Sequence, residues 1–151
     1  MANTQAMTTS FKGELLTGTH NFGTAPVRAS GAADTFKAAL YLASATVNAT
    51  TTAYSSTGEV TGTNYTAGGV VVTNATPPAT SGTTAYWTPS ASIVYTNVTL
   101  TTAFDAVLIY NSTQSNKAVS VHTFGSQTVT AGTFTLTMPT NDASNGLIRI
   151  A

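Results

Sequence analysis

The side chains best suited to acid–base or metal chemistry are few in this sequence and far apart. The 151 residues contain no cysteine. The remaining candidates for such chemistry are His20, His122, Glu14, Asp34, Glu59, Asp105 and Asp142. A transition-metal site needs three or four convergent ligands, and these residues show no ligand spacing. We therefore expect neither a metal ion nor another bound cofactor.

One pair of residues could support nucleophilic catalysis. Asp105 and His122 lie on two strands that we expect to pair around a turn at residues 111–116, and in that register the two side chains stand directly opposite each other. A nearby serine would complete an arrangement like a hydrolase triad. The sequence has no Gly-x-Ser-x-Gly elbow to hold a nucleophile. We therefore favour a cross-strand polar pair at a contact surface and expect no enzymatic activity.

An apolar stripe near the N-terminus is a candidate contact with a partner protein. Met7, Phe11 and Leu15 recur every four residues, which predicts a helix over Thr4–Gly18 with the three side chains on one face. Thr4 could cap the start of this helix and Gly18 could end it. The spacing leaves open whether the stripe packs on its own domain or, as an arm, on a neighbouring subunit.

Two adjacent aromatic residues, Tyr86 and Trp87, are the second candidate contact. They precede Pro89 and are expected to anchor an aromatic cluster. If exposed, such rings could stack on a sugar, although aromatic side chains are more commonly buried. We therefore group Tyr86 and Trp87 with the N-terminal stripe as candidate partner-contact residues.

The elements that would position these side chains are mostly strands. Strand-forming residues flank the turn at residues 111–116, which predicts a central β-hairpin. Alternation places Phe104, Ala106, Leu108 and Tyr110 on one face of its first strand and Asp105, Val107 and Ile109 on the other. Both faces are largely apolar, so this strand should be covered on both sides.

Shorter strands are expected before and after the hairpin. They fall at residues 34–43, 59–61, 70–72, 92–100, 126–138 and 147–150, with loops at residues 20–31 and 76–82. About eight short strands separated by turns indicate an all-β protein, a β-sandwich or jelly roll. We expect residues 1–31 to form the N-terminal helix or arm and a loop, and residues 32–151 to form the β-sandwich domain.

The composition narrows the function classes. Only 7% of the residues are charged, the formal net charge is zero and 33 residues are threonine. No basic cluster suited to nucleic acid is present, and neither a secretory signal nor an apolar run of about 20 residues is found. A weakly charged surface is poor at keeping a protein monomeric. We therefore expect a homo-oligomer, a dimer or trimer.

Four segments of the sequence resemble small virion structural proteins of tailed bacteriophages. They are residues 36–46, 95–100, 104–111 and 132–139. Within that group the size is most similar to capsid decoration, or cement, proteins. The resemblance implies a β-sandwich or jelly roll without catalytic residues that binds the major capsid protein on the outside of the assembled shell. It also implies synthesis in the bacterial host cytoplasm and a final location on the virion.

The resemblance leaves other roles open. The expected N-terminal helix departs from the simplest decoration proteins and is compatible with a tail, connector or head-fibre component. Tyr86 and Trp87 are compatible with a carbohydrate-binding or adhesin β-sandwich.

Overall fold

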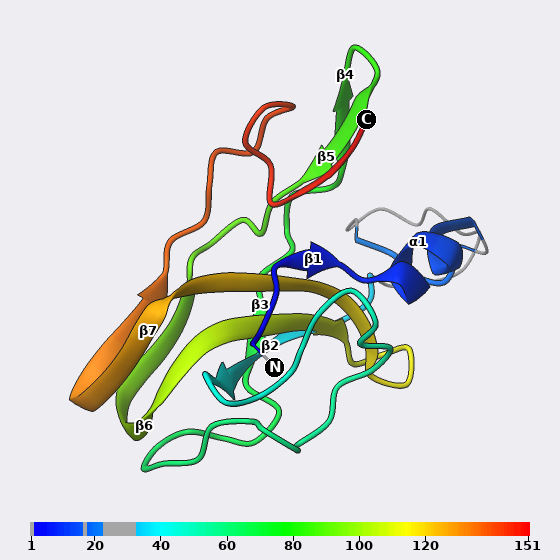
Figure 1. The fold of residues 1–151 in the computed structure, drawn as a ribbon. Helices are drawn as coiled ribbons and strands as arrows, with labels where there is room; N and C mark the ends of the chain where they lie inside the picture. Colours follow the sequence, from blue (N-terminus) through cyan, green and yellow to red (C-terminus); the bar gives the residue numbers. More distant parts are fainter. Residues whose placement is uncertain (1, 17, 23–32) are drawn as a thin grey trace.

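The computed structural model describes residues 2–16, 18–22 and 33–151 (Figure 1). The elements are β1 (Ala6–Met7), α1 (Thr9–Leu16), β2 (Phe36–Leu42), β3 (Val70–Val72), β4 (Ala79–Ser81), β5 (Thr84–Trp87), β6 (Ile93–Asn111), β7 (Lys117–Leu136) and β8 (Ile148–Ile150). A five-stranded antiparallel sheet has the order β1-β7-β6-β2-β3, and a three-stranded antiparallel sheet has the order β4-β5-β8. The predicted all-β class is confirmed.

The β6–β7 hairpin is the longest feature of the fold. β6 has 19 residues and β7 has 20, and the two strands bend together, so that one end of the hairpin lies far from α1 (Figure 1). The strand predicted at residues 92–100 is therefore not separate from the hairpin. Register shifts between Tyr95 and Phe104 mark bulges, and bulges bend and twist a strand pair without ending it.

The predicted hairpin turn is confirmed, with a small change at its start. Asn111 still pairs with Lys117 at the end of β6. Its Oδ1 accepts hydrogen bonds from the backbone N–H groups of Thr113 at 3.1 Å and Gln114 at 3.2 Å. This side chain therefore accepts the hydrogen bonds that a backbone carbonyl accepts in an ordinary turn.

Another bulge places Phe104 on a different face from the one predicted. Ala106 pairs with Tyr41 but Phe104 pairs with Leu42, so Asp105 is an extra residue in the ladder. Phe104 therefore joins the larger of two apolar cores, whereas Leu108 belongs to the smaller core on the other face of the sheet. The expectation that β6 is apolar and covered on both sides is confirmed, because both cores are buried.

The N-terminal helix begins later than predicted. Ala6 and Met7 form β1 and pair with Val121 and Ser120 of β7, so this stretch is extended and Thr4 caps nothing. The cap is Thr8, whose Oγ1 accepts a hydrogen bond from a backbone N–H in the first turn of α1. Residues 6 and 7 therefore form a strand on the sheet edge, although the spacing of Met7, Phe11 and Leu15 predicted a helix there.

Gly18 closes the C-terminal end of α1, as predicted, two residues beyond the last helical residue, Leu16. Gly18 has φ of 63°, its N–H donates to Leu15 O at 3.2 Å, and the N–H of Thr19 donates to Glu14 O at 3.0 Å. This pair of bonds is a Schellman motif, for which glycine is favoured because it adopts positive φ without steric cost.

Three smaller predictions can be compared with the structure. Within the loop predicted at residues 76–82, residues 79–81 form β4, an edge strand that follows the two prolines; an edge tolerates them nearby. In place of the strand predicted at residues 59–61 there is only a bridge between Tyr41 and Glu59. Residues 20–22 of the predicted N-terminal loop are irregular. The rest of that loop, with the proposed boundary after residue 31, lies outside the described residues.

Candidate functional site

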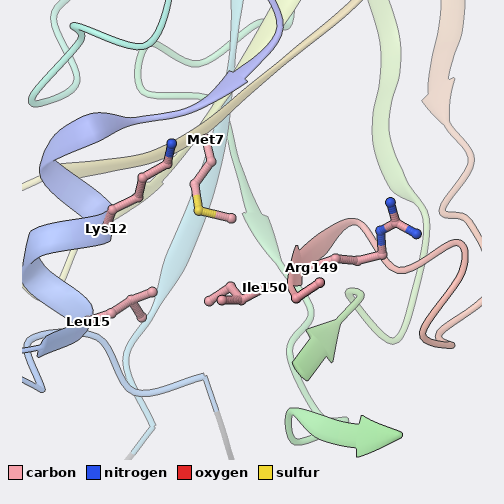
Figure 2. A pocket seen from close by; sticks show the side chains of 6 residues that line it. Met7, Lys12, Leu15, Arg149 and Ile150 are labelled. Atoms are coloured by element: carbon pink, nitrogen blue, oxygen red, sulfur yellow. The ribbon is translucent and has the colours of Figure 1, made fainter. Parts of the chain in front are cut away.

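The five candidate partner-contact residues converge on one cleft between α1 and β8, here called the α1–β8 cleft. Its outer part is a hollow of about 710 Å³, shown in Figure 2. The outer hollow is lined by Met7, Lys12, Leu15, Arg149, Ile150 and Ala151. Residues from β1 and α1 therefore face the last strand of the fold.

The inner part of the cleft is apolar. It is a hollow of about 210 Å³ that shares Leu15 and Ile150 with the outer hollow. Its lining residues are Phe11, Leu15, Phe22, Pro78, Ala85, Tyr86, Trp87, Ile148 and Ile150. The N-terminal stripe and the aromatic pair, about 70 residues apart in the sequence, thus line the same cleft.

The five residues differ in how much of each side chain is accessible. Phe11 and Trp87 are only 1% and 2% exposed, because both pack in the larger core. The Trp87 indole N–H already donates to Thr76 O at 3.0 Å, so this ring offers no open face to a sugar. Met7, Leu15 and Tyr86 are half-buried and form the accessible part of the predicted set.

A third, polar hollow of about 530 Å³ runs beside β8. It is bounded by residues 5–7 around β1, residues 120–122 of β7 and residues 144–149 before and within β8. Ser120 Oγ lies 2.9 Å from His122 Nε2 at its base. This serine–histidine contact was not predicted, although two polar residues spaced two apart in a strand must share a face.

The structure does not assemble the hypothetical triad. Two one-residue shifts change the register: Asn111 rather than Tyr110 pairs with Lys117, and a bulge follows between Ile109 and Tyr110. Val107 rather than Asp105 therefore stands opposite His122. Asp105 instead accepts a hydrogen bond from Asn3 Nδ2 at 2.6 Å. No acidic side chain lines the polar hollow, and burial lowers the pKa of His122 to about 4. The prediction that Asp105 and His122 pair is wrong.

His20 belongs to a buried polar network that ties α1 to the hairpin tip. His20 Nε2 lies 2.7 Å from Glu14 Oε2, and Glu14 Oε1 lies 2.6 Å from Lys117 Nζ. On the other side of the ring, Asn111 Nδ2 lies 3.0 Å from His20 Nδ1 and 2.8 Å from Asp34 Oδ2. The network joins helix, turn and sheet.

The protonation of His20 follows from its neighbours. The backbone of the turn holds Asn111 Oδ1, so Nδ2 must donate to His20 Nδ1, which accepts. The proton of a neutral His20 therefore lies on Nε2, facing Glu14. Burial lowers the pKa of His20, while the carboxylate of Glu14 opposes that shift. The ring is thus a neutral structural link between the helix and the turn.

A second buried network surrounds Glu59. Its Oε2 accepts a hydrogen bond from the Tyr54 hydroxyl at 2.6 Å, and its Oε1 accepts from the Tyr65 hydroxyl and the Gly68 N–H, each at 2.7 Å. Burial, followed by the nearby Glu59 carboxylate, raises the pKa of Tyr110 to about 12. The network connects the long irregular segment between β2 and β3 to the sheet.

These polar groups do not form a metal centre. Among the described residues, no three or more His, Cys, Asp or Glu side chains gather into a site that could hold a metal ion. In the same part of the chain, no helix is long and apolar enough to cross a membrane.

Comparisons with known proteins add no assignment. No protein-family model matches the sequence, and no curated protein or solved structure matches it significantly.

Proposed function

We propose that this protein is a non-enzymatic structural subunit of a tailed-phage virion, most like a capsid decoration protein that binds the outside of the assembled shell. In this proposal the two sheets are the layers of a β-sandwich, and the protein acts as a dimer or trimer on the major capsid protein. The resemblance of its segments to virion proteins motivates the assignment. The physical support comes from the surface.

The observation that carries the proposal is how little charge remains at the surface. The carboxylates of Asp34 and Glu59 are 5% and 6% exposed, and Glu14 is paired with Lys117. Three of the five acidic residues are thus engaged within the fold. The centres of protein interfaces are depleted in charge, and this chain combines that property with small neutral side chains over much of its surface.

A neutral surface lies at the bent end of the β6–β7 hairpin, here called the distal hairpin, residues 93–104 and 123–136. It contains no Lys, Arg, Asp or Glu. Val94, paired with Thr135, is 42% exposed there. No strand among the described residues pairs with the outer edge of β7 beyond its contact with β1. Unguarded strand edges are unusual unless a partner covers them.

The role is tested by locating the protein in purified virions. Quantitative mass spectrometry of particles from the phage that encodes the chain should find many copies per particle. Copies should fall when the distal hairpin carries Val94→Lys, because an unpaired charge is costly to bury in a contact with a partner. A few copies per particle would instead indicate a tail, connector or fibre part, and none would overturn the virion assignment.

A further inference from the structure

We propose that the α1–β8 cleft binds an extended, apolar segment of a partner chain that carries an acidic side chain, and that this segment adds a strand to the free edge of β8. The inference rests on the proposed structural role only in requiring a partner chain. It uses a different surface from the distal hairpin.

The free edge of β8 supplies the backbone groups for such a strand. β8 pairs with β5 through the contacts of Ile150 with Ala85 and of Ile148 with Trp87, and it ends the order β4-β5-β8 among the described residues. Peptides often bind by adding a strand to an edge of this kind, with main-chain hydrogen bonds giving affinity and side-chain pockets giving specificity.

Open space runs along this edge. The polar hollow of about 530 Å³ lies between β1 and residues 144–149, and the outer hollow of about 710 Å³ continues the opening between α1 and β8. A polar lining suits the peptide backbone, which must keep its hydrogen bonds. The two hollows share Met7 and Arg149, so an extended chain could run through both.

The side chains of the cleft select an apolar segment. Ile150 is 43% exposed, which is unusual for a large aliphatic residue in this protein. It faces Leu15 across the outer hollow, and both residues also line the inner apolar hollow (Figure 2). Alternate side chains of an added strand would point toward these residues, because strand side chains alternate between faces.

The charges of the cleft select an acidic group. Lys12 is exposed, and its ammonium group makes no hydrogen bond or ion pair with the described residues. The Arg149 guanidinium is turned away from the outer hollow and donates to Ala143 O and Ser144 O, so its stem alone lines the space (Figure 2). No acidic side chain lines any of the three hollows. Lys12 is therefore the cation available to a carboxylate of the partner.

The test measures peptide binding to the full chain. The probe is a fluorescein-labelled peptide of sequence Asp-Val-Thr-Val-Thr-Val, compared with the same peptide carrying Asn for Asp and with a version N-methylated at alternate residues. We expect the first to bind, the Asn peptide to bind about two- to five-fold more weakly because one exposed ion pair is lost, and the N-methylated peptide to bind at least tenfold more weakly.

Matched variants place the binding in the cleft. Lys12→Gln should remove the preference for Asp over Asn, whereas Lys37→Gln, on β2, should preserve it. Ile150→Asp should weaken binding at least tenfold, whereas Val71→Asp should not, although Val71 is 61% exposed on the edge strand β3. Amide exchange in β8 should slow when the peptide is added, and circular dichroism should show that each variant is folded.

Several results would overturn the inference. They are the absence of binding by any of the peptides at 1 mM, equal binding of the N-methylated peptide, and an unchanged Asp preference in Lys12→Gln. Binding of decanoate without binding of peptide would instead assign the cleft to a lipid. Because these measurements use the isolated protein, their failure leaves the particle experiment of the proposed function unaffected, and failure of that experiment leaves the peptide result standing.

Discussion

At the scale of single residues, Glu59 shows how a buried carboxylate is retained in a weakly charged protein. It is 6% exposed, yet it accepts hydrogen bonds from Tyr54, Tyr65 and Gly68. A buried charge is tolerated when its hydrogen-bonding capacity is met. These three residues and Glu59 all lie in the irregular segment between β2 and β3. The hydrogen bonds of Glu59 therefore fix the conformation of that segment.

Removal of the acceptors of Glu59 should therefore matter more than removal of its charge. Glu59→Gln keeps one oxygen for Tyr65 and Gly68 and should cost about 1 kcal/mol of unfolding free energy. Glu59→Leu leaves up to three donors without an acceptor and should cost at least about 2 kcal/mol more, because each unsatisfied buried donor costs about 1–3 kcal/mol. Urea unfolding of the two variants measures the difference. Equal destabilisation would show that charge, not hydrogen bonding, is what Glu59 supplies.

A glycine gives a second test at the residue scale. Gly69 has φ of 70°, and a Cβ there would lie 1.7 Å from Ala38 O, in the backbone of a buried strand. Gly69→Ala should therefore cost several kcal/mol, or prevent folding, since the strand cannot move aside. Gly82 has φ of 57° with no heavy atom within 4 Å of its Cβ position, so Gly82→Ala should cost only about 1–2 kcal/mol from backbone strain. Thermal melting of both variants should separate clash from strain.

At the scale of elements, the bulges set the limits of what the sequence could predict. The alternation of apolar residues identified the turn and the strand segments beside it, because that pattern depends only on local geometry. It also divided each long strand in two, since residues 92–100 and 126–138 were predicted as separate strands and instead belong to β6 and β7. One extra residue at Asp105 reversed the face of Phe104. Two further one-residue shifts, at the turn and at the bulge beside Tyr110, moved His122 opposite Val107. A bulge leaves no sequence signature as clear as a turn does, so registers and the triad built on them could not be predicted.

The candidate site was also predictable only where it depends on local sequence patterns. The stripe of Met7, Phe11 and Leu15 was visible from spacing, and Tyr86 with Trp87 from composition. Their meeting in one cleft depends on β8 returning to β5 across more than 60 residues, which no local pattern encodes. The Glu59 and His20 networks were missed for the same reason, since their members are far apart in the sequence.

The network around His20 makes the attachment of α1 sensitive to pH. His20 and His122 both have folded-state pKa values lowered by burial, to about 4 for His122, against about 6.5 in an unfolded chain. The unfolded state therefore binds protons first as pH falls. The stabilisation is complete above about pH 6.5 and is lost progressively between about pH 6.5 and pH 4.

Urea midpoints measured at pH 7.5, 5.5 and 4.5 should decrease steadily across this window. His122→Gln should remove the part of this fall in unfolding free energy that the protonation of His122 causes, on the order of 3 kcal/mol at most. His20→Gln should remove a separate share, because Glu14 and Asn111 contact His20 and not His122. A midpoint that is unchanged from pH 7.5 to 4.5 would contradict the neutral, buried state of both rings.

At the scale of the whole molecule, the fold reduces an already small charge. Ten charged residues sum to zero. Of the nine that the structure describes, only Lys12 and Arg149 are exposed, while Asp34 and Glu59 are buried and Glu14 pairs with Lys117. Long-range electrostatic steering and repulsion are therefore weak, and the contacts that we propose between copies would depend on apolar and neutral polar groups. This property distinguishes the protein from assemblies held by ion pairs.

The homo-oligomer that we expect should accordingly be insensitive to salt. Charge-driven association weakens steeply with ionic strength, whereas apolar burial does not. At about 1 M salt, screening confines electrostatic interactions to about 3 Å, and a dimer or trimer held through the distal hairpin should still persist. Light scattering at 0.05 M and 1 M sodium chloride should give the same mass at micromolar protein. Val94→Lys places a charge on that neutral surface. It should dissociate the oligomer most strongly at low salt, where repulsion between copies is least screened. Lys37→Gln, away from the distal hairpin, should leave the mass unchanged. A monomer under both conditions, or an oligomer that separates as salt rises, would show that neutral contacts do not hold the copies together.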